Sequence, residues 1–138
     1  MAFIHKRIVQ FAETDMAGVM HFSNYFRMME EAEHAFWRSM GQSVHATHDN
    51  KTISWPRVAV SCSYVAPVQF EEELTIRITV AKIGRRSLTM RYDFSCGERE
   101  VAYGEMKTVC CEVDQGKFGS IDIPPHIRAL VGAHPSDP

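Results

Sequence analysis

The sequence lacks any long hydrophobic run and any strong excess of charge of one sign. No apolar stretch approaches the roughly 20 residues that a helix needs to cross a bilayer, and the first residues lack the apolar core and cleavage site of a signal peptide. The formal net charge of -2 gives no reason to expect nucleic acid or an anionic membrane as a partner. These absences predict a cytoplasmic protein that binds neither.

Cysteine is also scarce, and its spacing argues against metal and disulfide roles. The chain has four cysteines and no C-x-x-C pair, and its histidines show neither HxH nor HExxH spacing. We therefore expect no metal and no redox cofactor, and we interpret the cysteines as reduced, mostly buried thiols. Adjacent Cys110 and Cys111 would point to opposite faces of one strand.

The composition is that of a folded globular protein. Its 138 residues are 45% hydrophobic and 23% charged, which is enough to bury one substantial core. No linker, repeat or low-complexity segment divides the chain. We expect a single domain over residues 1–138, with a frayed tail at residues 132–138.

One long helical pattern follows an acidic turn near the N-terminus. Ser23 is a plausible N-cap and Gly41 a plausible residue just past the C-terminal end. Between them, apolar residues recur at three- and four-residue steps and share one face, which favours a broad buried stripe. The stripe consists of Tyr25, Met29, Ala32, Phe36 and Met40.

The remaining chain has the period of two that is typical of strands. Strands are predicted at residues 3–12, 58–64, 74–80, 88–94 and 101–114, loops at 42–54 and 115–120, and a short helix at 124–131. Short turns make the last four strands antiparallel neighbours, so the prediction is an α+β domain with one helix against one sheet. One helix covers only one face, so we expect a homo-oligomer.

The turn before the helix carries the best catalytic candidate. Asp15 precedes a helix N-terminus, where the first backbone N–H groups have no intrahelical acceptor and can polarise a carbonyl group. Aspartate is also common where chains merely turn. Both interpretations of Asp15 are open at this stage.

The motif DMAGVMHFSNY at Asp15–Tyr25, with Glu30 further along the helix, resembles the hot-dog-fold acyl-CoA thioesterases, and most closely the 4-hydroxybenzoyl-CoA thioesterase family. The resemblance covers nearly the whole chain. Two weaker signals, Tyr64-Val-Ala-Pro67 and Gly84-Arg-Arg-Ser87, occur in the correct order and spacing.

The resemblance implies a hot-dog fold, in which a curved antiparallel sheet wraps one long helix. It also implies that two subunits join their sheets and that the active site lies at the subunit interface. We expect a homodimer, and beyond it a homotetramer whose arrangement the sequence does not define. The implied activity is hydrolysis of an acyl- or aryl-CoA thioester to free acid and CoA. Coenzyme A is then part of the substrate, and no cofactor is needed.

The resemblance also assigns roles to residues. The family's catalytic aspartate falls on Asp15, as nucleophile or general base, and its carbonyl-polarising N–H falls on the backbone of Phe22. Several relatives carry Tyr or His at the position of Phe22, so the neighbouring His21 either supplies a side-chain donor or has no role in chemistry. Glu30 is a candidate for a supporting or interface position.

Substrate contacts are predicted at two places. Arg85 and Arg86, with Lys82 nearby, are candidates to hold the phosphates of coenzyme A, although a charged hairpin turn is usually just solvated. Gly18 and Tyr25 are the other candidates, and Tyr25 also belongs to the buried stripe.

Two rival functions fit the same pattern. A hot-dog hydratase or dehydratase would pair His21 with Glu30 or Glu33 across a dimer. A non-catalytic acyl-CoA-binding module would use Asp15 only as a turn residue.

Overall fold

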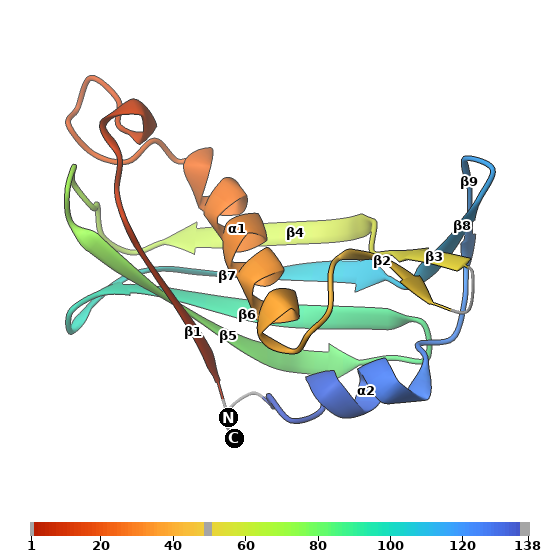
Figure 1. Ribbon diagram of the computed structural model, residues 1–138. Helices are drawn as coiled ribbons and strands as arrows, with labels where there is room; N and C mark the ends of the chain where they lie inside the picture. The colour runs from red at the N-terminus through yellow and green to blue at the C-terminus, as the bar shows by residue number, and fades with distance from the viewer. Residues whose placement is uncertain (1, 49–50, 136–138) are drawn as a thin grey trace.

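A five-stranded antiparallel sheet forms the body of the protein, and one long helix crosses its face (Figure 1). The structure is a computed structural model and describes residues 2–48 and 51–135. The helix is α1 (Asn24–Ser39). The sheet has the order β1-β5-β6-β7-β4, with β1 at Phe3–Ile8, β4 at Arg57–Tyr64, β5 at Glu73–Ile83, β6 at Ser87–Cys96 and β7 at Arg99–Val109. The predicted α+β class, with one helix against one sheet, is confirmed.

The central strands bury one face against α1, as their alternation predicts. In β5, Ile76 and Ile78 are fully buried and lie opposite Phe94 and Tyr92 of β6. The polar residues between them are more exposed. Burial of these large apolar side chains supplies the main driving force for folding.

The helix buries the predicted stripe and more. Four of the five stripe residues are buried, and the fifth, Met40, is the half-buried C-cap. Met28 and Trp37 are buried as well, which widens the stripe. Gly41 follows with φ +72°, the left-handed conformation that favours glycine after a helix. Ser23 is the N-cap residue, but its hydroxyl contacts the His21 ring instead of capping a backbone N–H.

The predicted strand order needs one correction. β4 does not pair with the next strand in sequence but with β7, at the far edge of the sheet. The connection of residues 65–72 spans up to ~27 Å when extended. It can therefore pass the ends of two intervening strands, which are spaced by ~4.8 Å. Strand β1 takes the place beside β5.

A second, four-stranded sheet was missed. The segment predicted as a loop at 42–54 holds β2 (His45–His48) and β3 (Lys51–Ser54), and the predicted loop at 115–120 holds β9 (Lys117–Ser120). The predicted strand 101–114 breaks at Cys110, after which β8 (Cys111–Asp114) joins this second sheet, of order β2-β3-β8-β9. Because the chain changes sheets there, Cys110 and Cys111 are both buried.

The N-terminal end of the chain also differs from prediction. The first strand ends at Ile8, and a short 3-10 helix follows at Phe11–Glu13. The C-terminal helix α2 (Pro125–Val131) forms near its expected place. After α2, the His134 carbonyl accepts the Val80 N–H at 2.6 Å, and fraying of the tail at residues 132–138 stays a prediction. Residues 136–138 of that tail lie outside the described part.

No helix within residues 2–48 and 51–135 combines the length and apolar character needed to span a bilayer.

Candidate active site

Asp15 lies on an exposed, tightly hydrogen-bonded loop just before α1. Its backbone N–H donates to the Val19 carbonyl at 3.0 Å, and its carbonyl accepts the Gly18 N–H at 3.0 Å. Its side-chain Oδ1 accepts the Ala17 N–H at 2.8 Å, which fixes the carboxylate relative to the loop. Gly18 has φ +81°, so the turn requires the left-handed conformation that glycine adopts without strain. Gly18 thus shapes the loop that presents the carboxylate.

The backbone at the start of α1 leaves one N–H group without an acceptor. The His21 N–H donates to the Glu13 carbonyl at 2.8 Å, and the Asn24 N–H donates to the His21 carbonyl at 3.0 Å. Ser23 donates its N–H to His21 Nδ1 at 3.3 Å. Among the described residues, the Phe22 N–H has no acceptor.

The orientation of that N–H group follows from the peptide geometry. The peptide bond between His21 and Phe22 is trans, so its N–H and C=O point in opposite directions. Because the His21 carbonyl points along the helix to the Asn24 N–H, the Phe22 N–H points outward from the helix start. Such a group can bind an anion or a polarised carbonyl oxygen.

Asp15 and Phe22 line one open cavity of about 350 Å³. Its other walls come from the loop before α1, from the first turn of the helix, and from the segment after β4. Those walls are mostly apolar and consist of Val19, Met20, Tyr25, Tyr64, Val65, Ala66 and Pro67. The structure therefore brings together Asp15, Phe22 and Tyr25 from the predicted site.

Tyr64 is a site residue that sequence reasoning did not single out. Its hydroxyl donates to the Phe22 carbonyl at 3.1 Å, and its ring packs edge-on against Tyr25 at 5.0 Å. Burial raises the pKa of Tyr25 to about 12 and also raises the pKa of Tyr64, so both phenols are neutral donors at neutral pH. The one sequence signal that could have indicated Tyr64 as a site residue is its place in the segment Tyr64-Val-Ala-Pro67.

A second group that the sequence did not reveal ties β1 to this loop. The Arg7 guanidinium pairs with the carboxylates of Glu13 and Glu31. The Asn24 side-chain amide donates a hydrogen bond to the backbone carbonyl of Glu13 at 2.8 Å. The contacts of Arg7 with Glu31 and of Asn24 with Glu13 join residues 24 and 11 positions apart in sequence, so no local pattern indicates them. They fix the backbone from which the His21-Phe22 peptide extends.

His21 has a structural contact but does not line the cavity. Its Nδ1 lies 2.8 Å from the Ser23 hydroxyl, and its ring lies against that of Phe22, with centroids 4.6 Å apart. The ring therefore helps to hold the helix start.

Glu30 and Glu33 of α1 pair with Arg57, outside the cavity that contains Asp15. Glu30 is exposed and lies 3.4 Å from Arg57 Nη2. Glu33 is fully buried and pairs with the same guanidinium. Burial raises the pKa of Glu33, and the charge of Arg57 only partly offsets that effect. Neither carboxylate lines the cavity that contains Asp15.

The predicted phosphate-binding residues lie at the other end of the sheet. In Figure 1 the turn between β5 and β6 is close to α2, whereas the start of α1 lies at the opposite end. Asp122 accepts hydrogen bonds from Arg85 Nε at 3.1 Å and from Arg86 Nε at 2.9 Å, and these bonds lower its pKa. Lys82 is exposed near this turn. Within one chain these cations are not brought together with Asp15.

No group of three or more His, Cys, Asp or Glu side chains is arranged to hold a metal ion in the described ranges.

Comparison with known proteins agrees with this architecture. A family model described as the thioesterase-like superfamily matches residues 9–131. A protein of Aquifex aeolicus is 31% identical over 121 residues, which cover 88% of this chain and 92% of that protein. The 1,4-dihydroxy-2-naphthoyl-CoA hydrolase of Nostoc punctiforme is 26% identical, with 92% of this chain and 84% of the hydrolase covered. The solved structure of a gentisyl-coenzyme A thioesterase is 28% identical with a TM-score of 0.80, covering 91% of this chain and 99% of that chain.

The fold, with its helix across an antiparallel sheet, is the hot-dog fold. The chain belongs to the thioesterase-like superfamily. The predicted fold, the predicted family and the expected enzyme class, a thioester hydrolase, are confirmed.

Proposed function

We propose that the protein hydrolyses an acyl- or aryl-CoA thioester to the free acid and CoA, with Asp15 and the Phe22 N–H as its catalytic groups. The observation that carries the proposal is the Phe22 N–H, which has no acceptor among the described residues and belongs to a residue that lines the same cavity as Asp15. The relatives named as CoA thioester hydrolases support the choice of substrate class.

The chemistry needs a group that attacks and a group that stabilises charge. As a general base, Asp15 takes a proton from water while the water oxygen attacks the thioester carbon. As a nucleophile, its carboxylate attacks that carbon and forms an anhydride, which water then hydrolyses. In both routes the carbonyl oxygen becomes an oxyanion that accepts a hydrogen bond from the Phe22 N–H. CoA then leaves as a thiolate and takes up a proton.

The apolar walls of the cavity suit the acyl group. Val19, Met20 and the Tyr25 ring line it, and neutral apolar walls favour an uncharged acyl chain or ring. Tyr64 holds the Phe22 carbonyl from the strand side. We assign Tyr64 a positioning role, and His21 at most a supporting one at the helix start.

A second subunit would complete this open site. β4 forms one edge of the sheet, and Val58, Val60 and Tyr64 along it are about half exposed. An exposed edge strand with apolar side chains favours pairing with another chain. We propose that two copies pair through β4 into one continuous sheet, and that dimers associate into a homotetramer.

The oligomer gives the distant cations a role. The turn between β5 and β6, which carries Arg85 and Arg86, lies at the other end of the sheet from the start of α1 (Figure 1), so these arginines and the nearby Lys82 would hold the CoA phosphates only for the site of a neighbouring subunit. Asp122 occupies the Nε of both arginines, so their remaining N–H groups would make these contacts.

We further propose a cytoplasmic enzyme that uses no metal or redox cofactor. All four cysteines are free thiols, two of them buried, as expected for a protein in a reducing compartment.

A panel of aryl-CoA and aliphatic acyl-CoA thioesters tests the function, with release of free thiol and enoyl absorbance recorded together. Thiol release from at least one substrate, with no change in enoyl absorbance, is the expected result. A change in enoyl absorbance without thiol release would instead identify a hydratase. Tight binding of acyl-CoA with no thiol release from any substrate would identify a binding module.

A further inference from the structure

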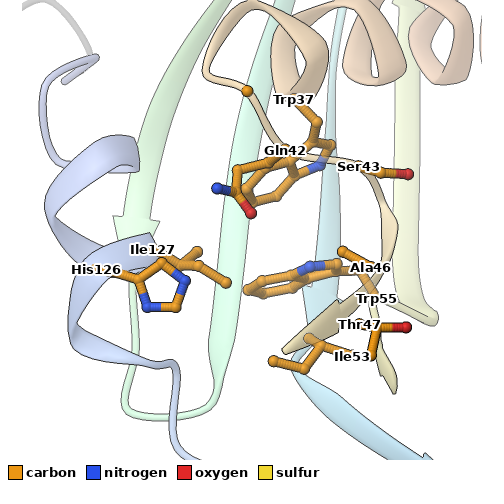
Figure 2. A pocket seen from close by; sticks show the side chains of 10 residues that line it. Trp37, Gln42, Ser43, Ala46, Thr47, Ile53, Trp55, His126 and Ile127 are labelled. Atoms are coloured by element: carbon orange, nitrogen blue, oxygen red, sulfur yellow. The ribbon is translucent and has the colours of Figure 1, made fainter. Parts of the chain in front are cut away.

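The protein has a second cavity, larger than the one that contains Asp15. Its volume is about 550 Å³, and it lies at the C-terminal end of α1. Figure 2 shows its walls: residues from α1 and the segment after it on one side, α2 on another, and β2 with β3 below. It shares no lining residue with the cavity at the helix start. The proposed hydrolysis has no use for it.

The inner part of this cavity is apolar and aromatic. The indole rings of Trp37 and Trp55 stack with centroids 5.2 Å apart and an angle of 27° between them. Ile53 and Ile127 complete the inner wall, and all four residues are buried. Stacked rings and branched aliphatic side chains offer flat surfaces that favour a planar aromatic ligand.

The mouth is polar, and the described residues that line it carry no carboxylate, ammonium or guanidinium group. Gln42, Ser43, Thr47 and His126 line it and are at least partly exposed. None of the described lining residues is Asp, Glu, Lys or Arg. Apart from the His126 ring, these residues offer no basic side chain to the phosphates of a CoA thioester, so that substrate fits poorly. Amide and hydroxyl groups instead match a neutral ligand that has a hydrogen-bonding edge.

We propose that this cavity is a separate binding site for a neutral, flat aromatic molecule that carries a hydroxyl or similar polar group. The ring lies against the Trp55 and Trp37 side of the cavity, and the polar group stays at the mouth near Gln42 and Ser43. A volume of about 550 Å³ is within the range of about 300–1,000 Å³ that is usual for small-molecule sites.

The protein's own fluorescence can test this site with 2-naphthol as the probe. The chain has only two tryptophans, and both line the cavity. Titration of the full-length protein should give a saturable change in tryptophan emission, and calorimetry should give the same dissociation constant. Because 2-naphthol itself absorbs and emits in the range of tryptophan, a solution of free tryptophan titrated in parallel corrects the emission, and the proposal fails if calorimetry detects no binding at millimolar 2-naphthol.

Two blocking variants and one control locate the binding. Ala46→Phe fills the cavity from β2, and Ser43→Phe covers its mouth at an exposed position. Ala129→Phe makes the same change on the exposed face of α2, outside the cavity. We expect at least tenfold weaker binding in both blocking variants and unchanged binding in the control, with circular dichroism verifying that each is folded. Unchanged binding in a folded Ser43→Phe and Ala46→Phe pair would overturn the proposal.

Discussion

At the scale of single residues, the proposed mechanism depends on a backbone group instead of a side chain. Among the described residues the Phe22 N–H has no acceptor, whereas the neighbouring N–H groups are all bonded: that of His21 to the Glu13 carbonyl, that of Ser23 to the His21 ring, and that of Asn24 to the His21 carbonyl. A side-chain change at Phe22 should therefore matter little, whereas loss of its N–H should matter greatly.

A proline at this position tests that contrast. Phe22→Pro removes the N–H at a place just before the helix, where proline is tolerated. We expect thiol release to fall by about 10²–10³-fold, as for loss of one oxyanion donor. Phe22→Ala keeps the N–H and should retain activity within about tenfold of the original. Equal activity of the two variants would show that the N–H has no catalytic part.

Glu33 should make stability depend on pH in a defined direction. Burial raises its pKa above 4.5, so the folded protein holds this proton more tightly than the unfolded chain does. Its contribution to stability is then full below pH 4.5 and is lost as the pH rises through the raised value. Since glutamine does not titrate, the stability of Glu33→Gln relative to the original protein should rise as the pH increases from 4.5 to the raised pKa of Glu33, and should level off above it.

Urea denaturation at several pH values between about 5 and 8 measures this difference. Glu72→Gln is the control, because the Gln69 N–H and the Arg99 guanidinium lower the pKa of Glu72. That contribution is present above pH 4.5 and is lost only as the pH falls through the lowered value. The difference for Glu72→Gln should stay flat over this range, and a flat difference for Glu33→Gln as well would contradict the account.

At the scale of elements, the close packing of β7 against β4 and α1 requires a glycine at position 104. A Cβ atom at Gly104 would lie 2.2 Å from the Ser61 carbonyl oxygen and 2.6 Å from Met29 Cε. The first of these atoms belongs to the backbone of β4, and the second to α1. The absence of a Cβ thus lets the helix and the edge strand approach β7 closely.

Gly104→Ala should therefore destabilise the fold. Overpacking of a filled core costs about 1–3 kcal/mol, and the clash with the β4 backbone places the effect at the upper end. Gly119→Ala is the matched control, because a Cβ there meets nothing within 4 Å, and we expect a change within about 0.5 kcal/mol. Thermal or urea unfolding of both variants provides the comparison, and equal stabilities would refute the packing argument.

The elements also show which features local sequence could predict. The predictions of β5, β6 and α1 were correct, because an element that buries one face has apolar residues at the period of a strand or of a helix. The β2–β3 hairpin was missed because it is short and largely polar. The break between β7 and β8 was missed because the pattern continues through Cys110 while the chain changes sheets.

The candidate site was predictable to the same limited extent. Asp15 and Phe22 were placed by a local motif before a helix, and they do line one cavity. The Tyr64 contact arises from a residue 42 positions along the chain, which only the tertiary fold brings close. The distance of Arg85 from Asp15 could not be foreseen either, because it depends on which end of the sheet each turn occupies.

At the scale of the whole molecule, one exposed strand edge should decide whether the enzyme assembles. Val60 on β4 is 50% exposed, and Ile4 on the opposite edge strand, β1, is 46% exposed. Tyr64 at the end of β4 lines the Asp15 cavity, whereas no described residue of β1 is among its lining residues. We therefore expect the two edges to respond differently to a buried charge.

Val60→Lys should leave the fold intact and produce a monomer, because a lysine on an edge strand opposes pairing. Hydrolysis should fall in parallel with the dimer fraction, since the open cavity then lacks its second wall. Ile4→Lys is the control and should retain both assembly and activity. Light scattering coupled to size exclusion gives the oligomeric state, and an assembled Val60→Lys variant would exclude β4 as the interface.

The central claim, that Asp15 performs the chemistry instead of only shaping a turn, is tested most directly by Asp15→Asn. The amide keeps the size of the side chain and its hydrogen bond from Ala17, but it can neither attack the thioester nor accept a proton from water. For the best acyl-CoA of the substrate panel, we predict that kcat falls by about 10²–10⁴-fold while the dissociation constant measured by calorimetry stays nearly unchanged. Near-normal turnover by Asp15→Asn would contradict the account.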